Sequence, residues 1–203
     1  LLYGNEDYSQ FASQLGAAPV KAMCLHMAHD CNLRCRYCFA STGGYDGARS
    51  LMNFETAKSA IDLLVRLSEG RRNLEVDFFG GEPMLNFEVL KATVEYARKI
   101  EQEQGKNFRF TVTTNGLTLT PESIEYINRE MSNVVLSIDG RQEVNDRMRV
   151  RVDGSGSYSS IVPKFQQLAA VRGDKEYYVR GTYTRYHLDF DRDVLALYDM
   201  GFD

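Results

Sequence analysis

Apolar stretches of strand length alternate five times with segments whose apolar residues recur at helical spacing. The predicted strands are 21–28, 73–79, 108–114, 133–139 and 176–184. Five helices are predicted between and after these strands. The first starts near Asn53, the second carries Leu90, Val94 and Ala97, and the third starts at Thr120. The last two span about 161–172 and 191–200. Such alternation predicts an α/β fold with a parallel sheet and right-handed crossovers.

Apolar and polar residues alternate within the predicted strands. In 73–79, Leu74, Val76 and Phe78 alternate with Glu75 and Asp77, and the later strands follow the same pattern. Strands of an open sheet covered on both faces tend to be apolar throughout. One apolar face toward the helices and one polar face toward a lumen is typical of a barrel wall. We therefore predict a partial TIM-like (β/α) barrel that ends after about five β/α units.

The composition is that of an ordinary soluble domain. The chain has 203 residues, of which 43% are hydrophobic and 26% charged, and its formal net charge is -4. This charge gives no reason to expect a nucleic-acid or membrane partner, and we find neither a membrane-spanning apolar run nor a signal peptide. Three of the four cysteines cluster, which fits metal ligation in a reducing compartment. We expect a cytoplasmic protein.

The clustered cysteines are Cys31, Cys35 and Cys38, in the sequence CNLRCRYC, and they follow the first predicted strand. Thiolates are soft ligands that suit iron–sulfur clusters and zinc. A [4Fe–4S] cluster usually takes four thiolates. Three cysteines would leave one iron free, so we expect the fourth ligand to be a substrate or cosubstrate.

A zinc site is the alternative for these cysteines. It would add His29, His26 or Cys24 to the three thiolates. Zinc sites more often consist of two separated C-x2-C pairs. Cys24 lies within the first predicted strand, where a small residue that is packed or lines the lumen is the simpler interpretation.

The spacing C-x3-C-x2-C, with an aromatic residue before the last cysteine and a β/α barrel around it, resembles the radical S-adenosylmethionine (SAM) superfamily. The resemblance implies a [4Fe–4S] cluster whose open iron is chelated by the amino and carboxylate groups of SAM. Reductive cleavage of SAM would then give a 5′-deoxyadenosyl radical that abstracts a hydrogen atom. Because the radical would do the abstraction, we predict no catalytic acid or base in the chain.

The sequence FGGEP, residues 79–83, ends the second predicted strand. Two glycines let a backbone come close to a ligand, although the same residues also suit an ordinary strand-to-helix turn. By resemblance to the GGE motif of the family, Gly80, Gly81 and Glu82 would contact the SAM amino group, mostly through backbone carbonyls. Tyr37 would lie near the adenine.

Further polar residues lie at the ends of the later strands. Asn115, Ser137, Asp139 and Arg180 are predicted to share the lumen side and to bind the ribose and carboxylate of SAM. The family resemblance favours Ser137 and Arg180 for these roles, and an arginine fork suits a carboxylate. Arg149 is the alternative for the carboxylate. TNG and SIDG, which contain Asn115 and Asp139, are also turn signals.

Longer stretches narrow the resemblance. CLHMAHDCNLRCRYCFAST, RRNLEVDFFGGEPMLNF and SIDGRQEVNDRMR are most similar to SPASM-type peptide maturases that act on SCIFF peptides. This resemblance implies a Cys thioether crosslink in a cysteine-containing precursor peptide, with a flavodoxin or ferredoxin as electron donor. Anaerobic sulfatase-maturating enzymes share GGEP and SIDG, so formylglycine formation is an alternative. A non-catalytic iron–sulfur or zinc protein is the alternative of another class.

The same resemblance suggests a domain organisation. Residues 1–20 are expected to be a linker from an N-terminal peptide-recognition domain, and residues 21–203 an incomplete radical SAM core. This stretch contains no C-terminal SPASM domain, so we expect auxiliary clusters to lie outside it.

Overall fold

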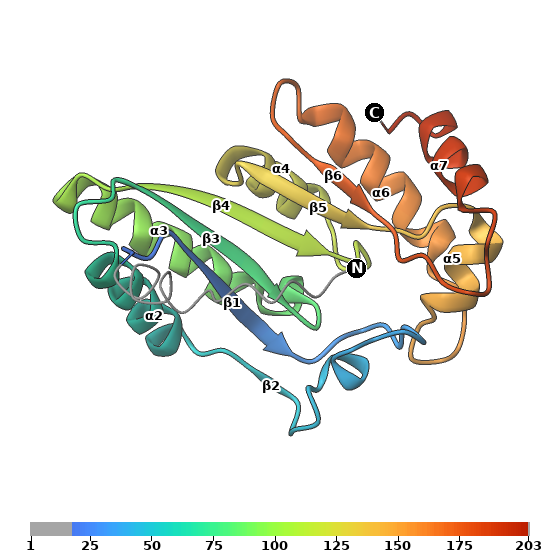
Figure 1. The fold of residues 1–203 in the computed structure, drawn as a ribbon, viewed down its shortest axis with the longest axis horizontal. Coiled ribbons are helices and arrows are strands. Elements are labelled where there is room, and N and C mark those ends of the chain that lie inside the picture. The colour runs from blue at the N-terminus through green and yellow to red at the C-terminus, as the bar shows by residue number, and fades with distance from the viewer. Residues whose placement is uncertain (1–17, 203) are drawn as a thin grey trace, which may run out of the picture.

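The structure is a computed structural model that describes residues 18–202 (Figure 1). Most of the expected linker at 1–20 therefore lies outside the described residues. Within residues 18–202, one six-stranded sheet has the order β2-β1-β3-β4-β5-β6, in which only β2 is antiparallel to its neighbour. The strands are β1 (Ala22–His29), β2 (Ser50–Leu51), β3 (Asn73–Gly80), β4 (Asn107–Thr114), β5 (Asn133–Ser137) and β6 (Tyr178–Arg180).

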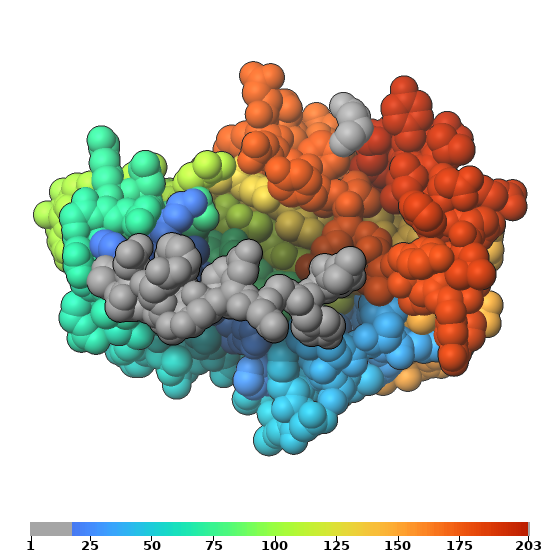
Figure 2. Space-filling model, in the orientation of Figure 1, coloured from blue at the N-terminus to red at the C-terminus, as the bar shows by residue number. Residues whose placement is uncertain are grey.

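Helices cover one face of this sheet. They are α2 (Phe54–Leu67), α3 (Phe87–Gln104), α4 (Pro121–Glu130), α5 (Gln142–Met148), α6 (Tyr158–Val171) and α7 (Phe190–Asp199), with short 3-10 turns η1 (Ser41–Gly43) and η2 (Pro83–Asn86). The parallel strands and their crossover helices form a partial barrel wall, as predicted. Figure 2 shows the cysteine-loop region (blue) and the C-terminal segments (orange to red) on either side of the hollowed face of the sheet.

Local signals set the helix ends. The Asn53 side chain accepts a hydrogen bond from the Thr56 amide at 2.8 Å and begins α2. Thr120 and Ser123 form a capping box at the start of α4, with a proline at its first position. Gly105 ends α3 in the left-handed conformation, with φ 65°. The side chains at the two helix starts accept hydrogen bonds from free backbone amides, and glycine adopts the left-handed conformation at a helix end without a steric clash.

The predicted alternation within strands is confirmed. Leu74, Val76 and Phe78 of β3 are fully buried against the helices, whereas Glu75 and Asp77 face the other way and are partly or fully exposed. The core continues through Phe108, Phe110 and Val112 of β4 and Val134, Leu136 and Ile138 at β5. The opposite face of the sheet is therefore free to carry the polar site.

Several element predictions were wrong in detail. The last strand spans Tyr178–Arg180 rather than 176–184, because beyond Gly181 the Thr182 amide donates to the Asp139 carboxylate at 3.0 Å and leaves the strand ladder. The fourth strand ends at Ser137 rather than at 139. The two-residue strand β2 and the seven-residue helix α5 were not predicted. Both are too short to show a clear period.

Among the described residues, no helix combines the length and apolar character that crossing a bilayer requires.

Candidate cluster and cosubstrate site

A cavity of about 280 Å³ lies at the carboxyl ends of the parallel strands. Ten of the eleven predicted site residues line it, namely Cys31, Cys35, Tyr37, Cys38, Gly80, Gly81, Glu82, Asn115, Ser137 and Arg180. Asp139 is the exception. Active sites of β/α barrels occur at this end of the strands, so the predicted residues meet at the expected place.

The cysteine loop is held by backbone contacts on its outer side. The Arg34 amide donates to the Val150 carbonyl at 2.7 Å, and the Arg36 amide donates to the Met148 carbonyl at 2.9 Å. Leu33 and Arg151 form an antiparallel bridge. The segment after β5 thus fixes the loop from a position more than one hundred residues away in sequence.

All three cysteine side chains face the cavity. Burial, with a smaller contribution from Glu82, raises the pKa of the Cys31 thiol to about 12, and burial also raises the pKa of Cys35. Such thiols are ionised readily only when a metal replaces the proton.

The three thiols line one cavity, and this arrangement fits a cluster. A cubane cluster needs each thiolate on a different iron, so its ligands stand further apart around a larger space. Three thiols around one cavity fit that requirement.

The two glycines of FGGEP allow close contact with the chain that enters the cysteine loop. The Gly81 amide donates to the Ala28 carbonyl at 2.8 Å, and the Glu82 amide donates to the Asp30 carbonyl at 2.9 Å. A Cβ atom at Gly80 would overlap the Ala28 carbonyl oxygen, and one at Gly81 would overlap the Asp30 carbonyl oxygen. The sequence suggested that the glycine backbone comes close to a ligand. The structure shows that this backbone also packs against the backbone of residues 28–30.

The Glu82 side chain joins the ends of β3 and β4. It is 1% exposed, and its carboxylate accepts hydrogen bonds from the Thr114 hydroxyl at 2.8 Å and the amides of Asn115 at 2.7 Å and Met84 at 3.1 Å. Burial raises its pKa. Because the carboxylate is satisfied by the protein, a ligand would meet the backbone of this segment, as the family resemblance implies.

Asn115 links β4 to the cysteine loop. Its Nδ2 donates to Asn32 Oδ1 at 2.8 Å and lies 3.6 Å from Cys31 Sγ. Its Oδ1 accepts from the Leu117 amide at 3.0 Å, which is the turn role that the TNG sequence suggested. Asn115 therefore has the turn role, and its contact with SAM stays a prediction.

Tyr37, Asp139 and Arg149 form a buried network beside the cavity. The Tyr37 hydroxyl lies 2.7 and 2.9 Å from the two Asp139 carboxylate oxygens and accepts from Arg149 Nη1 at 2.8 Å. Burial raises the pKa of Asp139 and of Tyr37. Asp139 is 4% exposed and also binds the Thr182 amide, so it lies behind Tyr37 and does not line the cavity.

Two arginines face the cavity from different environments. Arg149 is 7% exposed, and its Nε has no hydrogen-bond partner among the described residues. Arg180 is exposed and neither hydrogen-bonds nor forms an ion pair through its side chain within the part of the chain that the structure describes. It pairs in register with Ser137 of β5, which places a cation and a hydroxyl side by side.

The cavity also includes residues that the site prediction omitted. Thr113, Thr182 and Phe79 line it together with the predicted set. Thr113 and Phe79 lie on the lumen side of β4 and β3, so strand alternation could have identified them. Thr182 follows the end of β6 and carried no comparable signal.

Comparisons with known proteins agree with this geometry. The family model described as "Radical SAM superfamily" matches residues 25–171. An uncharacterized protein of Methanocaldococcus jannaschii is 33% identical over 138 residues, which are 68% of this chain and 45% of that protein. The cysteine-type anaerobic sulfatase-maturating enzyme of Clostridium novyi is 27% identical over 145 residues, covering 68% of this chain and 37% of that enzyme.

A further relative is the radical SAM cyclopropyl synthase TigE of Paramaledivibacter caminithermalis, 25% identical over 160 residues, with coverage of 73% of this chain and 33% of TigE. The solved structure of anSMEcpe with bound AdoMet superposes with a TM-score of 0.77 at 20% identity, over 89% of this chain and 48% of that one. The chain thus spans less than half the length of these proteins. It belongs to the radical SAM superfamily, a family of enzymes that bind a [4Fe–4S] cluster and SAM.

Proposed function

We propose that this chain is the cluster- and SAM-binding core of a radical SAM oxidoreductase that matures a ribosomally made peptide. The observation that carries the proposal is the convergence of three cysteines, the FGGEP backbone and two arginines on one cavity. When bound and reduced, the cluster supplies the electron that cleaves SAM to a 5′-deoxyadenosyl radical able to abstract hydrogen from the peptide.

The residues around the cavity have distinct proposed roles. Cys31, Cys35 and Cys38 hold the cluster through their thiolates. The backbone of Gly80, Gly81 and Glu82 accepts the SAM amino group, and Asn115 and Ser137 contact the ribose and carboxylate. Tyr37 lies near the adenine. These roles match the chemistry of each group, since carbonyls accept from an ammonium and hydroxyls or amides bind a ribose.

An arginine is the natural partner for the SAM carboxylate. Arg180 is the proposed partner, and Arg149 is the rival because its Nε is buried without a hydrogen bond. Asp139 would act on the cosubstrate through the Tyr37 hydroxyl that it holds.

The proposed substrate is a cysteine-containing precursor peptide, and the proposed product is a thioether between the cysteine sulfur and a carbon of another residue. Support comes from the resemblance to SCIFF-peptide maturases in the cysteine loop, FGGEP and SIDG segments. The solved anSMEcpe structures with Cp18Cys and Kp18Cys peptides are consistent with a peptide substrate at a site of this fold.

Formylglycine formation is the second candidate. It is favoured by the cysteine-type and serine-type sulfatase-maturating enzymes among the relatives, from Clostridium novyi and Bacteroides thetaiotaomicron. Either reaction needs an electron donor such as a flavodoxin or ferredoxin. Reduced donors and free cysteines both fit a cytoplasmic enzyme.

The test begins with anaerobic reconstitution of the full-length protein that contains this chain. A reduced [4Fe–4S] cluster should give an electron paramagnetic resonance signal that shifts when SAM is added. Cys31→Ala, Cys35→Ala and Cys38→Ala should each abolish the signal, whereas Cys24→Ala should retain it. A signal that ignores SAM, or zinc bound in place of iron, would contradict the proposal and support a non-catalytic metal protein.

Mass spectrometry of the treated peptide separates the two reactions. Thioether formation removes two hydrogen atoms and retains the sulfur, whereas formylglycine formation from cysteine replaces the sulfur with an aldehyde oxygen. The second product would overturn the thioether assignment while leaving the radical SAM assignment in place.

A further inference from the structure

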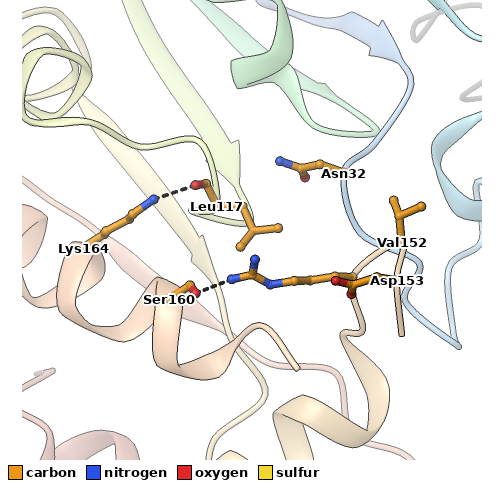
Figure 3. Close-up of a pocket in the computed structure, with 7 residues that line it drawn as sticks. Asn32, Leu117, Val152, Asp153, Ser160 and Lys164 are labelled. Carbon is orange, nitrogen blue, oxygen red and sulfur yellow. Dashed lines mark hydrogen bonds between the residues drawn. The ribbon is translucent and has the colours of Figure 1, made fainter. Parts of the chain in front are cut away.

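We propose that an open groove on the outer side of the cysteine loop is the docking surface for an acidic one-electron donor protein. The groove has a volume of about 740 Å³ and lies between the cysteine loop, the turn after β4 and the start of α6 (Figure 3). Asn32, Leu117, Arg151, Val152 and Lys164 are among its lining residues. The proposal rests on the proposed function, because only a redox cluster behind this wall would need a donor.

The groove lies close to a predicted cluster ligand. Asn32 follows Cys31 directly, and its side chain accepts from Asn115 Nδ2 at 2.8 Å. The same Nδ2 lies 3.6 Å from Cys31 Sγ. One layer of side chains therefore separates the floor of the groove from a sulfur that would bind iron, which is a short path for an electron.

The groove is also independent of the cosubstrate cavity. None of its lining residues lines the cavity that holds the three cysteines. A protein bound in the groove would therefore leave the cavity open to SAM and to a peptide. An electron donor needs this arrangement, because it must reach the cluster while the cosubstrate is bound.

Charge indicates the kind of partner. The paired segments 31–38 and 147–152 contain five arginines and no acidic residue, in a chain whose net charge is -4. None of these arginines forms an ion pair in the described structure, whereas many arginines elsewhere do. Arg149 is buried and faces the cavity, so the other four arginines, all at least partly exposed, make the surface around the loop locally basic.

The cations of the groove itself bind neutral oxygens. Lys164 Nζ donates to the Leu117 carbonyl at 2.6 Å (Figure 3). The Arg151 guanidinium donates to the Gly156 carbonyl and to the Ser160 hydroxyl. Among the described residues, Asp153 is the one carboxylate that lines the groove, and hydrogen bonds from Ser155 lower its pKa. Two cations against one anion leave the groove positive and able to attract an acidic partner.

These features fit a small redox protein that carries a reduced flavin or an iron–sulfur centre beneath an acidic surface. Electron-transfer complexes are small and polar, and opposite charges mainly speed their formation. The donor loses one electron and the [4Fe–4S]2+ cluster gains it as [4Fe–4S]+. No atom or proton is transferred.

The test uses the reconstituted full-length protein and photoreduced flavodoxin, with the rate of cluster reduction followed in a stopped-flow spectrometer. Val152 is 65% exposed and lines the groove, so a charged side chain can replace it without loss of a buried packing contact. At low ionic strength, Val152→Lys should raise the second-order rate and Val152→Glu should lower it, each by roughly threefold, and Lys164→Glu should lower it by about tenfold. High salt should reduce all three effects.

Two controls test whether the rate depends on charge in the groove and on a protein donor. Arg66→Glu changes an exposed charge on α2, far from the groove, and should leave the rate unchanged. Reduction by a small neutral deazaflavin should be the same in every variant. Equal flavodoxin rates in the two Val152 variants would overturn the proposal, as would a parallel change with deazaflavin, since the charge would then act on the cluster itself.

The same samples distinguish the two proposals. If the cluster forms and responds to SAM while the Val152 charge has no effect on reduction by flavodoxin, only the docking proposal fails. If no SAM-responsive cluster forms, the proposed function fails and the docking proposal fails with it. A change in the KM for the peptide without a change in reduction rate would assign the groove to the substrate and overturn the docking proposal.

Discussion

The two sides of the cavity are built differently. On the side of β1, β3 and β4, backbone contacts hold the cysteine loop against FGGEP, and the Glu82 carboxylate is 1% exposed. On the side of β5 and β6, the last strand has only three residues, and Tyr178 within it is 55% exposed. We call the side formed by β1, β3, β4 and the cysteine loop the frame, and the side formed by β5 and β6 the open edge.

The difference continues in the surface beyond each side. Most of the exposed large hydrophobic side chains lie between residues 178 and 198, on β6, the segment after it and α7. A cluster needs ligands at fixed positions, which a close-packed backbone provides. The open edge carries Arg180, whose side chain is exposed and has no hydrogen bond or ion pair among the described residues. We infer that the frame determines whether a cluster is retained and the edge determines how well ligands are held.

Gly81→Ala should have the largest effect, because it breaks the frame. The new methyl group would overlap the backbone carbonyl of Asp30, and neither backbone segment can move without disturbing the cysteine loop. We expect a loss of about 3 kcal/mol in the free energy of unfolding and loss of the reconstituted cluster. Thermal unfolding and iron content measure the two effects. Gly70→Ala is the matched control, since nothing lies within 4 Å of its Cβ position; equal behaviour of the two variants would show that the frame is not close-packed.

Tyr37→Phe should have the next largest effect, because its hydroxyl joins the cysteine loop to the segments after β5. The change leaves the buried Asp139 and Arg149 without a shared partner. We expect a loss of about 2 kcal/mol in the free energy of unfolding, measured by urea titration. Tyr96→Phe also removes a hydroxyl bound to a carboxylate, at 2.6 Å, but on an exposed surface, and it should cost much less. Similar losses in both variants would mean that the network does not couple the two sides.

The frame is also the part that the sequence predicted well. The spacing of Cys31, Cys35 and Cys38, the glycine pair and the strand alternation are all local patterns, and each constrains its own segment. Helix caps at Asn53 and Thr120 were predicted for the same reason, because a side chain binds the backbone three residues away. Of the predicted site residues, Cys31, Cys35, Cys38, Gly80 and Gly81 belong to this side and line the cavity.

The open edge was predicted less well because contacts between distant residues shape it. The length of β6 depends on Asp139, which accepts from an amide that lies 43 residues further along the chain. Asp139 itself was predicted to face SAM, but the structure places it behind Tyr37, 102 residues away in sequence. The SIDG sequence does not indicate that the Thr182 amide and the Tyr37 hydroxyl bind Asp139. Short elements such as α5 have the same difficulty, because a seven-residue helix shows too few repeats to be recognised.

Arg180→Met should separate ligand binding from stability at the open edge. The side chain is exposed and has no hydrogen bond or ion pair among the described residues, so the free energy of unfolding should change by less than about 0.5 kcal/mol. If Arg180 holds the SAM carboxylate, the dissociation constant for SAM should rise by roughly tenfold, measured by titration of the cluster signal. Arg149→Met is the comparison, and a larger loss of SAM affinity there, with Arg180→Met unchanged, would assign the carboxylate to the buried arginine.

The smallest expected effect concerns the ion pairs that hold α7 near this edge. Arg141 Nη2 lies 3.0 Å from an Asp189 carboxylate oxygen, and this hydrogen bond lowers the pKa of Asp189 below its ordinary value of 3.8. A lowered pKa in the folded state stabilises the protein above the ordinary pKa, and this contribution is lost as the pH falls through the lowered value. Arg141→Gln should therefore lower the melting temperature slightly at pH 7 and should have less effect near pH 3.

Arg192→Gln provides the control for that pH dependence. Arg192 Nη1 lies 3.5 Å from the same Asp189 carboxylate, but its own side chain is 67% exposed, against 17% for Arg141. Solvent screens the more exposed pair, so its removal should change the melting temperature less at every pH. An Arg141 variant whose melting temperature follows that of wild type between pH 3 and 7 would show that these ion pairs do not anchor the edge. The position of α7 would then depend on its packing alone, through Leu197 and Met200 against the core.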